Sequence, residues 1–254
     1  MISRYEVTLN GIALSSVHPD ILILDVNYAA PGYERETFTS AKRHGARIHR
    51  LYKGQASVTI SFAVRAYDIR TRQQIVQEIC KWAKNGGDLQ INDRPGQKLV
   101  CVCEALPAVS SVQKWTDTLY MTFTAYNLPY WQATKAVALE MTGTSESGTL
   151  FIPGSAPETM VEATITANAA LSSISLTVGD TTLQLTGLSI SAESTIVISY
   201  DADMIQSIKT GTTSLLSKRS GADDLIAACG ETNTFSFVSS ASCTVEFRAR
   251  GCWE

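Results

Sequence analysis

The chain has 254 residues, of which 44% are hydrophobic and 18% are charged, and its formal net charge is −3 at pH 7. This length allows two ordinary domains or one large one, and the mildly acidic balance argues against general nucleic-acid binding. No run of about 20 apolar residues suggests a membrane span, and the opening residues MISRYEVTLNG lack the apolar segment of a secretory signal.

The charges are distributed unevenly along the chain. Residues 1–134 hold 15 Lys and Arg against 11 Asp and Glu, whereas residues 135–254 hold 6 against 13. The two parts therefore differ in sign, which indicates two units with different surfaces. We expect domains at residues 1–134 and 135–254.

Two strand signals open the first domain. Residues Tyr5–Leu14 alternate around Asn10-Gly11, a dipeptide that favours a two-residue hairpin turn. A second apolar stretch predicts a strand over Ile21–Tyr28.

A polar, basic segment over Tyr28–Lys53 follows these strands. It lies between Pro31-Gly32 and Gly54, and it carries six Lys and Arg against two Glu. Apolar residues form two islands, one on each side of Ser40–Gly45. This pattern predicts a long hairpin arm that leaves the body of the domain.

Three roles fit such an arm. An exchange arm would add strands to a neighbouring molecule's sheet, which is a recurring mode of recognition. A basic nucleic-acid arm would need aromatic stacking platforms between its charges, and only Phe38 and Tyr52 are available. A solvated surface loop is the third alternative. For the exchange arm, the predicted oligomer interface comprises Arg35, Phe38, Arg47, Ile48, Arg50, Leu51 and Tyr52.

In the next segment the spacing of apolar residues changes from every second residue, as in a strand, to the 3.6-residue period of a helix. Alternating apolar residues over Ser57–Ala66 predict a half-buried strand. Apolar residues then recur at i, i+4, i+7 and i+8 from Ile75, after Asp68 as a candidate N-cap. Asn85-Gly86-Gly87 ends the pattern, so a helix is predicted over about Ile69–Lys84.

Further strands are predicted on both sides of the domain boundary. In the first domain they cover Leu89–Ile91, Leu99–Leu106 and Thr118–Tyr126, with a turn at Asn92–Gly96. The second domain is rich in Ser, Thr and Ala, and its short strands have the spacing of a β-sandwich. These strands are Val161–Ala167, Ser173–Val178, Thr181–Leu185, Ser194–Tyr200, Ile205–Thr210, Thr234–Val238 and Cys243–Arg250, with loops at Ser145–Gly148 and Pro153–Pro157.

No catalytic, cofactor or metal site is predicted. The six cysteines are too sparse for a disulfide scaffold, so reduced thiols are expected, and Cys101-x-Cys103 lacks partners at metal spacing. No G-x-S-x-G elbow is present that could use one of the histidines, His18, His44 and His49. The pairs Asp201-x-Asp203 and Asp223-Asp224 could bind Ca²⁺, but carboxylates at strand ends more often satisfy turns.

The order of these elements resembles the distal tail protein family of siphophages, the long-tailed phages with non-contractile tails, and the related prophage tail components. The resemblance lies in the strand Val58–Val64 followed by the Arg72–Lys84 helix, the turn L-Q-I-N-D-R-P-G, and Leu119–Tyr126 before Pro-Tyr-Trp. It continues in Gly-x-x-x-x-Pro-Gly from Gly148 and in the aromatic and basic strand Val245–Trp253.

The resemblance implies a mainly β fold with one α-helix. The first domain would be a ring-forming split β-barrel with a hairpin arm at about residues 28–53 and the helix at about residues 69–84. The second would be a galectin-like β-sandwich. No large insertion for an added carbohydrate-binding module is visible.

The resemblance also implies a structural virion protein, not an enzyme, without cofactors. It would form a homohexameric distal tail ring, the baseplate hub, at the phage tail tip, after assembly in the host cytoplasm. The expected partners are the tail tube protein, the tail-tip hub protein and a receptor-binding or tape-measure protein, with no membrane and no sequence-specific nucleic acid. The alternative is a carbohydrate-binding β-sandwich that recognises the bacterial surface.

Overall fold

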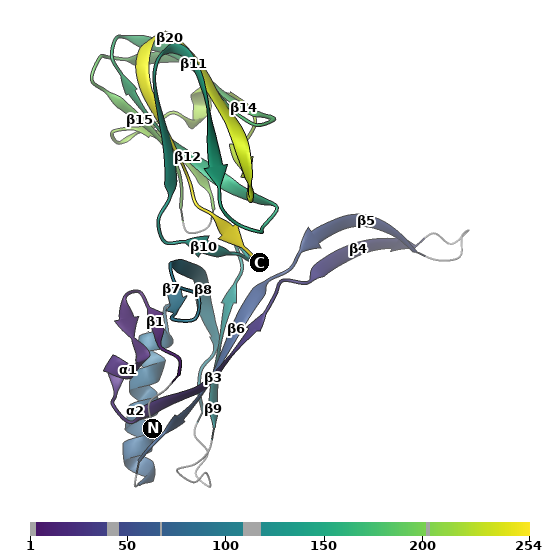
Figure 1. Cartoon of the computed structure of the whole chain (residues 1–254), viewed down its shortest axis with the longest axis vertical. Coiled ribbons are helices and arrows are strands. Elements are labelled where there is room, and N and C mark those ends of the chain that lie inside the picture. The colour runs from purple at the N-terminus through teal and green to yellow at the C-terminus, as the bar shows by residue number, and fades with distance from the viewer. Residues whose placement is uncertain (1–3, 40–45, 67, 109–117, 202–203) are drawn as a thin grey trace. The chain divides into compact units, whose positions relative to one another are not determined.

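The computed structural model describes residues 4–39, 46–66, 68–108, 118–201 and 204–254. The chain divides into two compact units, Met1–Trp131 together with Glu254, and Gln132–Trp253. Both are built mainly from strands, and the described part has one long helix (Figure 1). The predicted mainly β class with one helix is confirmed.

Unit 1 is a curled, half-barrel sheet with a helix against it. Its sheet has the order β2-β1-β7-β8-β9-β6-β3, and the hairpin β4–β5 forms a separate two-stranded sheet. The elements are β1 (Val7–Leu9), β2 (Ile12–Ala13), the one-turn α1 (Leu14–Val17), β3 (Ile21–Ala29), β4 (Tyr33–Thr39), β5 (Ala46–Lys53), β6 (Ala56–Val64), α2 (Ile69–Ala83), β7 (Gly87–Ile91), β8 (Gln97–Ala105) and β9 (Leu119–Ala125). The short strand β10 (Trp131–Ala133) begins at the last residue of this stretch and continues into the first residues of unit 2.

The helix α2 begins and ends at the predicted signals. Its N-cap Asp68 accepts hydrogen bonds from Thr71 N at 2.8 Å and from Thr71 Oγ1 at 2.7 Å, which lowers the pKa of the Asp68 carboxyl. Ile75 and Ile79 on its apolar face are buried. Beyond its C-cap, Gly86 has a positive φ of 62° and donates to Ala83 O at 3.0 Å, so the helix stops there. Among the described residues, no helix has the length and apolar character to span a membrane.

The core of unit 1 lies between α2 and one face of the sheet. Alternate residues of β6 are buried there, among them Ile60 and Phe62, together with Phe123 of β9. The indole of Trp82 meets the Phe123 ring edge-on at 6.2 Å and donates to Ile12 O at 2.9 Å. The helix therefore joins the central strands to the N-terminal hairpin.

The N-terminal hairpin turns at Asn10 and Gly11, with φ values of 51° and 80°, as the sequence predicts. The Asn10 side chain donates to Gly86 O at 2.8 Å and accepts from Asp88 N at 2.9 Å. Its close approach requires Gly87, because a Cβ there would lie 2.1 Å from Asn10 Oδ1. One turn residue thus connects the hairpin to the end of the helix.

Unit 2 is organised around the long hairpin β11–β20. Its elements are β11 (Val137–Ile152), β12 (Glu158–Ala167), β13 (Leu171–Val178), β14 (Thr181–Ile190), β15 (Thr195–Tyr200), β16 (Gln206–Thr210), β17 (Thr213–Ser214), a 3₁₀ turn (Leu216–Lys218), β18 (Arg219–Gly221), β19 (Ile226–Ala228), β20 (Glu231–Ala249) and β21 (Cys252–Trp253). Strand β20 pairs with β11 along nearly its whole length.

On the other side of β20 the partner strand changes along its length. Residues 235–239 pair with β13, whereas residues 243–249 pair with β12. The rings of Phe235 and Phe247 lie 5.2 Å apart, although 12 extended residues would separate them by roughly 40 Å. The strand therefore bends back over the core, and its two halves belong to the two layers of a sandwich.

The β-sandwich is confirmed, but two details of the prediction are wrong. Ser145–Gly148 is not a loop, because it lies inside β11 and pairs with residues of β20 up to Phe235. The predicted strands Thr234–Val238 and Cys243–Arg250 are one strand. Small and polar residues at these positions indicate turns locally, yet each strand of the long hairpin supplies backbone partners to the other. The galectin-like arrangement stays a prediction.

Candidate functional site

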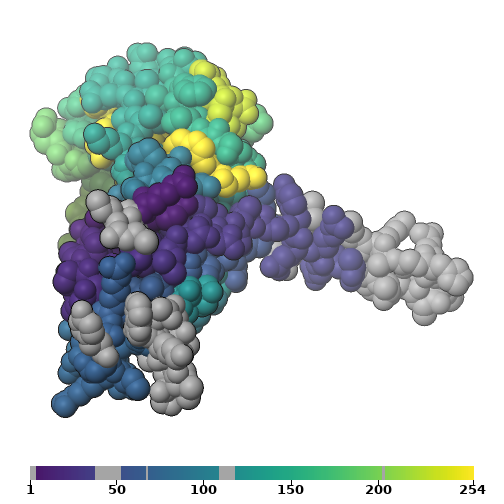
Figure 2. All heavy atoms as spheres, turned by 60° about the horizontal axis from the view of Figure 1, so that its bottom comes forward, coloured from purple at the N-terminus to yellow at the C-terminus, as the bar shows by residue number. Residues whose placement is uncertain are grey.

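The hairpin β4–β5 extends away from the rest of unit 1 (Figures 1 and 2). Its strands pair antiparallel from Tyr33–Lys53 to Thr39–Ala46, with a bulge after Glu36. Among the described strands, they pair only with each other. The predicted hairpin arm is therefore present.

The structure places the predicted interface residues on the arm without showing what they contact. Arg35 is exposed and lies opposite Leu51 in the ladder. The other residues belong to the same two strands by their backbone, but their side chains lie outside the described part of the structure: Phe38, Arg47, Ile48, Arg50, Leu51 and Tyr52. The predicted interface stays a prediction.

The arm is closed at its base by glycines. Gly54 N donates to Gly32 O at 2.7 Å, which adds one hydrogen bond beyond the last pair of the ladder. A Cβ at Gly54 would lie 2.9 Å from Glu34 Oε1 and 3.3 Å from Gly32 O. A side chain at position 54 would therefore displace the end of the exposed Glu34 side chain and lie in tight contact with Gly32 O.

Lys53 anchors the last residue of β5 to the body of unit 1. Its ammonium lies 5.4 Å from the ring centroid of Tyr33 and 5.3 Å from that of Tyr130, and it pairs with the carboxylate of Glu254. The Lys53 side chain is only 12% exposed, so these contacts are less screened than those of a surface lysine. Tyr130 is itself buried, which fixes one wall of this contact.

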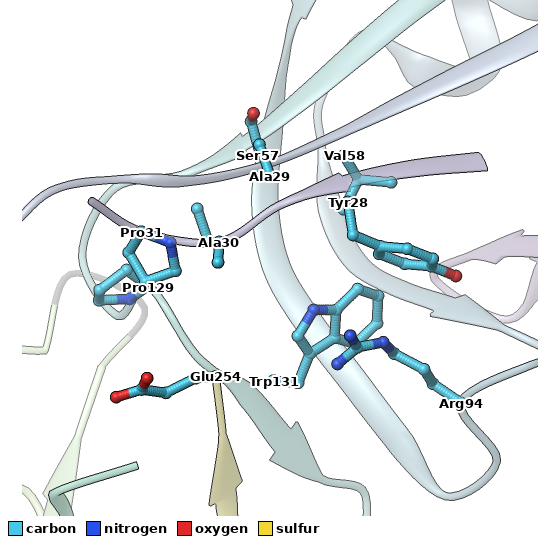
Figure 3. A pocket seen from close by; sticks show the side chains of 11 residues that line it. Tyr28, Ala29, Ala30, Pro31, Ser57, Val58, Arg94, Pro129, Trp131 and Glu254 are labelled. Atoms are coloured by element: carbon cyan, nitrogen blue, oxygen red, sulfur yellow. The ribbon is translucent and has the colours of Figure 1, made fainter. Parts of the chain in front are cut away.

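A second anchor lies at the end of β3, where the chain enters the arm. The Tyr28 hydroxyl donates to Asp93 Oδ1 at 2.5 Å. The Arg94 guanidinium lies 4.7 Å from the Tyr28 ring centroid and 4.9 Å from that of Trp131, and the two rings meet edge-on at 5.8 Å (Figure 3). Burial, followed by the hydrogen bond to Asp93, raises the pKa of Tyr28 above its usual range.

These anchors border a small cavity of about 160 Å³ (Figure 3). Its walls come from both chain segments at the arm's base, from the turn between β7 and β8, from the segment with Pro129 and Trp131, and from the last residue. They include Tyr28, Pro31, Ala56, Arg94, Trp131 and Glu254. The walls combine aromatic and aliphatic side chains with one cation and one carboxylate. The contacts among Tyr28, Arg94 and Trp131 therefore form part of the cavity wall.

Asp201 and Asp223, two of the residues considered for metal binding, have structural partners. Asp201 Oδ1 accepts from Ile205 N at 2.9 Å, as a turn carboxylate does, and Asp223 pairs with Arg219 at 2.6 Å. Asp203 and His44 lie outside the described residues. The described residues contain no group of three or more His, Cys, Asp or Glu side chains that could hold a metal ion.

Sequence reasoning missed the base of the arm as a site. The turn with Asp93 and Arg94 and the junction with Tyr130 and Trp131 stood out only as parts of the family pattern. Nothing in their spacing predicts that they meet Tyr28 and Lys53, because the contacts join residues far apart in the chain. A signal was nevertheless present, since an Asp-Arg turn and a Tyr-Trp pair are suited to cation–π contacts.

No family model and no curated protein matches the chain in sequence comparisons. Among solved structures, it is similar to the Dit protein of phage SPP1, with 12% identity, a TM-score of 0.68, and coverage of 97% of this chain and 98% of that one. It is less similar to chains of the phage p2 baseplate in its activated conformation. One, from the structure with Sr, has 10% identity, a TM-score of 0.47 and 97% coverage of both chains. The other, from the structure with Ca, has 9% identity, a TM-score of 0.48, and covers 99% of this chain and 98% of that one. The likeness to SPP1 Dit extends over both units, so this chain has the Dit fold from end to end.

Proposed function

We propose that the chain is a structural virion protein that forms the distal tail ring, or baseplate hub, of a siphophage. The observation that carries the proposal is the likeness to SPP1 Dit over the whole chain. That protein is described as a paradigm of the hub adsorption apparatus in phages infecting Gram-positive bacteria. In this role the chain acts by assembly, and no reaction is assigned to it.

The arm supports the proposal on physical grounds. A two-stranded hairpin is marginally stable in water, because each strand has one edge without backbone partners. Here the hairpin stands apart from the sheet of its own unit, while Lys53 and Tyr28 fix its base. An arm with a fixed base and free edges is suited to pairing with the sheet of a neighbour.

The ring closes by head-to-tail contacts, in which the arm of one copy lies on unit 1 of the next. Six copies form the ring, with the tail tube protein on one side and the tail-tip hub and receptor-binding or tape-measure proteins as its other partners. Residues 1–134 form the ring and residues 135–254 form the β-sandwich domain. The protein resides at the tail tip of the virion after assembly in the host cytoplasm.

The test is the mass of the purified chain in solution, measured by light scattering and native mass spectrometry. We expect a species of six times the 27.5 kDa chain mass. Replacing Arg35–Arg50 by a short Asn-Gly turn removes most of β4 and β5, and it should yield monomers that keep the other strands and the helix α2. A matched control, Lys209→Ala on the exposed surface of β16, should leave the ring intact.

Two outcomes would contradict the proposal at different points. If the full-length chain stays monomeric at micromolar concentration, the proposal that it forms a ring is wrong. If the ring survives the deletion, only the proposed role of the arm in closing the ring is wrong. None of the contacts above favours the carbohydrate-binding alternative. Saturable binding of the full chain to a glycan array would restore that alternative.

A further inference from the structure

The cavity at the base of the arm contains polar groups that its anchors leave unused. All of its lining residues belong to unit 1, and they include the exposed Ala29 and Ala30, so the cavity reaches the surface. Its volume of about 160 Å³ is close to that of an engineered protein cavity that takes up benzene. It therefore has room for one small molecule.

Arg94 presents unused hydrogen-bond donors in the wall of this cavity. Its guanidinium lies 4.7 Å from the ring centroid of Tyr28 and 4.9 Å from that of Trp131. Among the described residues, this guanidinium has no carboxylate in an ion pair and no hydrogen-bond acceptor. A guanidinium that lies over aromatic rings keeps the N–H groups at its edge free to donate, in the planar fork that matches a carboxylate.

Trp131 adds a second free donor to the same wall. The residue is buried, yet its Nε1–H has no hydrogen-bond acceptor within the part of the chain that the structure describes. Figure 3 shows the indole nitrogen on the side of the ring that faces Ala30 and Pro129. An indole N–H and a guanidinium can only donate hydrogen bonds, so the group that satisfies both must be an acceptor.

The other polar side chains of the wall do not satisfy these donors. The Tyr28 hydroxyl donates to Asp93 Oδ1, and the Ser57 hydroxyl points away from the cavity (Figure 3). The Glu254 carboxylate would repel an anion, but the ammonium of Lys53 pairs with it and offsets its charge. Aliphatic side chains form the rest of the wall: Ala29, Ala30, Pro31, Ala56, Val58 and Pro129.

We propose that this cavity binds a small carboxylate with an apolar body. The carboxylate accepts hydrogen bonds from the edge of Arg94 and from Trp131 Nε1–H, and the apolar body packs against the aliphatic wall. Two rings already orient the guanidinium, so little side-chain freedom is lost on binding. Charged hydrogen bonds and burial of the apolar body then both favour this ligand over water.

A bound carboxylate would also connect the segments from which the arm extends. Tyr28–Pro31 leads from β3 into the arm, and Ala56–Val58 begins β6 just after the arm ends. A ligand in contact with both segments steadies the base of the arm. Hydrogen exchange in β4 and β5 should therefore slow down when the cavity is filled.

The probe is benzoate, and benzamide serves as a neutral molecule of the same size. Titration calorimetry on the full-length chain should show saturable binding of one benzoate per chain. Benzamide should bind at least about tenfold more weakly, because it lacks the charge that strengthens the hydrogen bonds. Equal affinities for the two probes, or no saturable binding of benzoate, would overturn the proposal.

Fluorine NMR locates the bound probe. Labelling with 5-fluorotryptophan gives one signal for each of the four tryptophans, and Trp131→Phe identifies the signal of Trp131. Benzoate should shift this signal and leave the others in place. A shift of another tryptophan without a shift of Trp131 would show that benzoate binds elsewhere, and it would contradict the proposed site.

Variants measure what each donor contributes. Arg94→Gln should weaken benzoate binding by about tenfold or more, and Trp131→Phe, which keeps an aromatic ring, by roughly fivefold. Arg4→Gln is the matched control, since Arg4 lies over the ring of Tyr5 at 5.8 Å and outside the cavity, and it should bind benzoate as the unchanged chain does. Unchanged affinity in a folded Arg94→Gln variant would refute the role of Arg94. The comparison of benzoate with benzamide needs no variant, so it decides the matter even where a variant fails to fold.

The same titration separates a free carboxylate from an acidic side chain of a neighbouring copy. It is repeated on the variant in which Asn-Gly replaces Arg35–Arg50, which keeps the cavity residues and is expected to be monomeric. Equal binding in both forms supports a free small carboxylate. Binding by the monomer alone would show that a neighbouring copy fills the cavity, and it would overturn the choice of a small molecule. A full-length chain that never assembles would contradict the proposed ring and leave the carboxylate site intact, so the two proposals can fail separately.

Discussion

The chain contains two prominent hairpins, of which one lies in the core of its unit and the other projects from its unit. The hairpin β11–β20 has strands of 16 and 19 residues, and both strands contribute buried residues to the unit 2 core. The hairpin β4–β5 has strands of 7 and 8 residues and pairs with no other described strand. The same local motif therefore serves in one unit as the centre of a core and in the other as a projecting arm.

The sequences of the hairpins explain this difference. Alternate positions in β20 carry Phe235, Phe237, Val245 and Phe247, all of which are buried, so the strand has one continuous apolar face. In β4 the sequence Y-E-R-E-T-F-T places Glu and Arg side by side and offers no such face. A hairpin without an apolar face gains little from packing on its own domain. Its position then depends on contacts at its base.

The largest effect should follow from breaking the bent hairpin of unit 2. Phe247→Ala removes a fully buried ring that contacts Phe235 across the sandwich. We expect a loss of about 3–5 kcal/mol in the free energy of unfolding, because the lost burial is joined by a cavity. Urea unfolding followed by circular dichroism measures it.

The matched control for this change lies on the same strand. Val238→Ala alters a side chain that is 58% exposed, and it should change the free energy of unfolding by less than about 0.5 kcal/mol. Equal losses in both variants would show that the bend does not depend on contact between the two layers.

The sequence predicts each hairpin to a different extent. Asn10-Gly11, the Asp68 cap and the alternation of β6 are local signals, and the structure follows them closely. The strand β11 escaped prediction because its burial is irregular and its Ser-Glu-Ser-Gly stretch resembles a turn. Its pairing is decided by β20, which lies far away in the sequence and whose register no local signal reveals.

For the arm too, local signals in the sequence predict some features and miss others. Its existence could be predicted from charge and from the bounding glycines, since these are local features. Its base could not, because Tyr28, Asp93, Arg94 and Trp131 meet only when three separate segments have folded. The periodicity of apolar residues shows which face of a strand or helix is buried. It does not show which polar and aromatic residues from distant segments come into contact in the folded chain.

A smaller effect is expected at the anchor of the arm. Lys53→Met removes the cation from Tyr33, Tyr130 and Glu254 and keeps most of the side-chain volume. We expect the base to open more easily by about 1 kcal/mol, which corresponds to roughly fivefold faster hydrogen exchange in β4 and β5. The free energy of global unfolding should hardly change, because the arm contributes no residues to the core.

Arg35→Met provides the control for this measurement, since the side chain of Arg35 is exposed. It should leave the exchange of both strands as in the unchanged chain when the protein is held monomeric by dilution. Faster exchange throughout unit 1 in Lys53→Met would show that this residue supports the domain rather than the arm.

The smallest effect concerns the second anchor and appears only at alkaline pH. The folded state raises the pKa of Tyr28, chiefly through burial and then through its hydrogen bond to Asp93, so folding favours the protonated phenol. This contribution is present below the usual pKa of tyrosine, near 10, and is lost as the pH rises above it. Urea unfolding of the chain between pH 8 and about 11 should therefore show a decline that is shallower in Tyr28→Phe. As a control, Tyr120→Phe changes a residue that is 59% exposed, and it should show the same decline in the free energy of unfolding as the unchanged chain. If Tyr28→Phe also showed that same decline, deprotonation of Tyr28 would not be the cause of the loss of stability at alkaline pH.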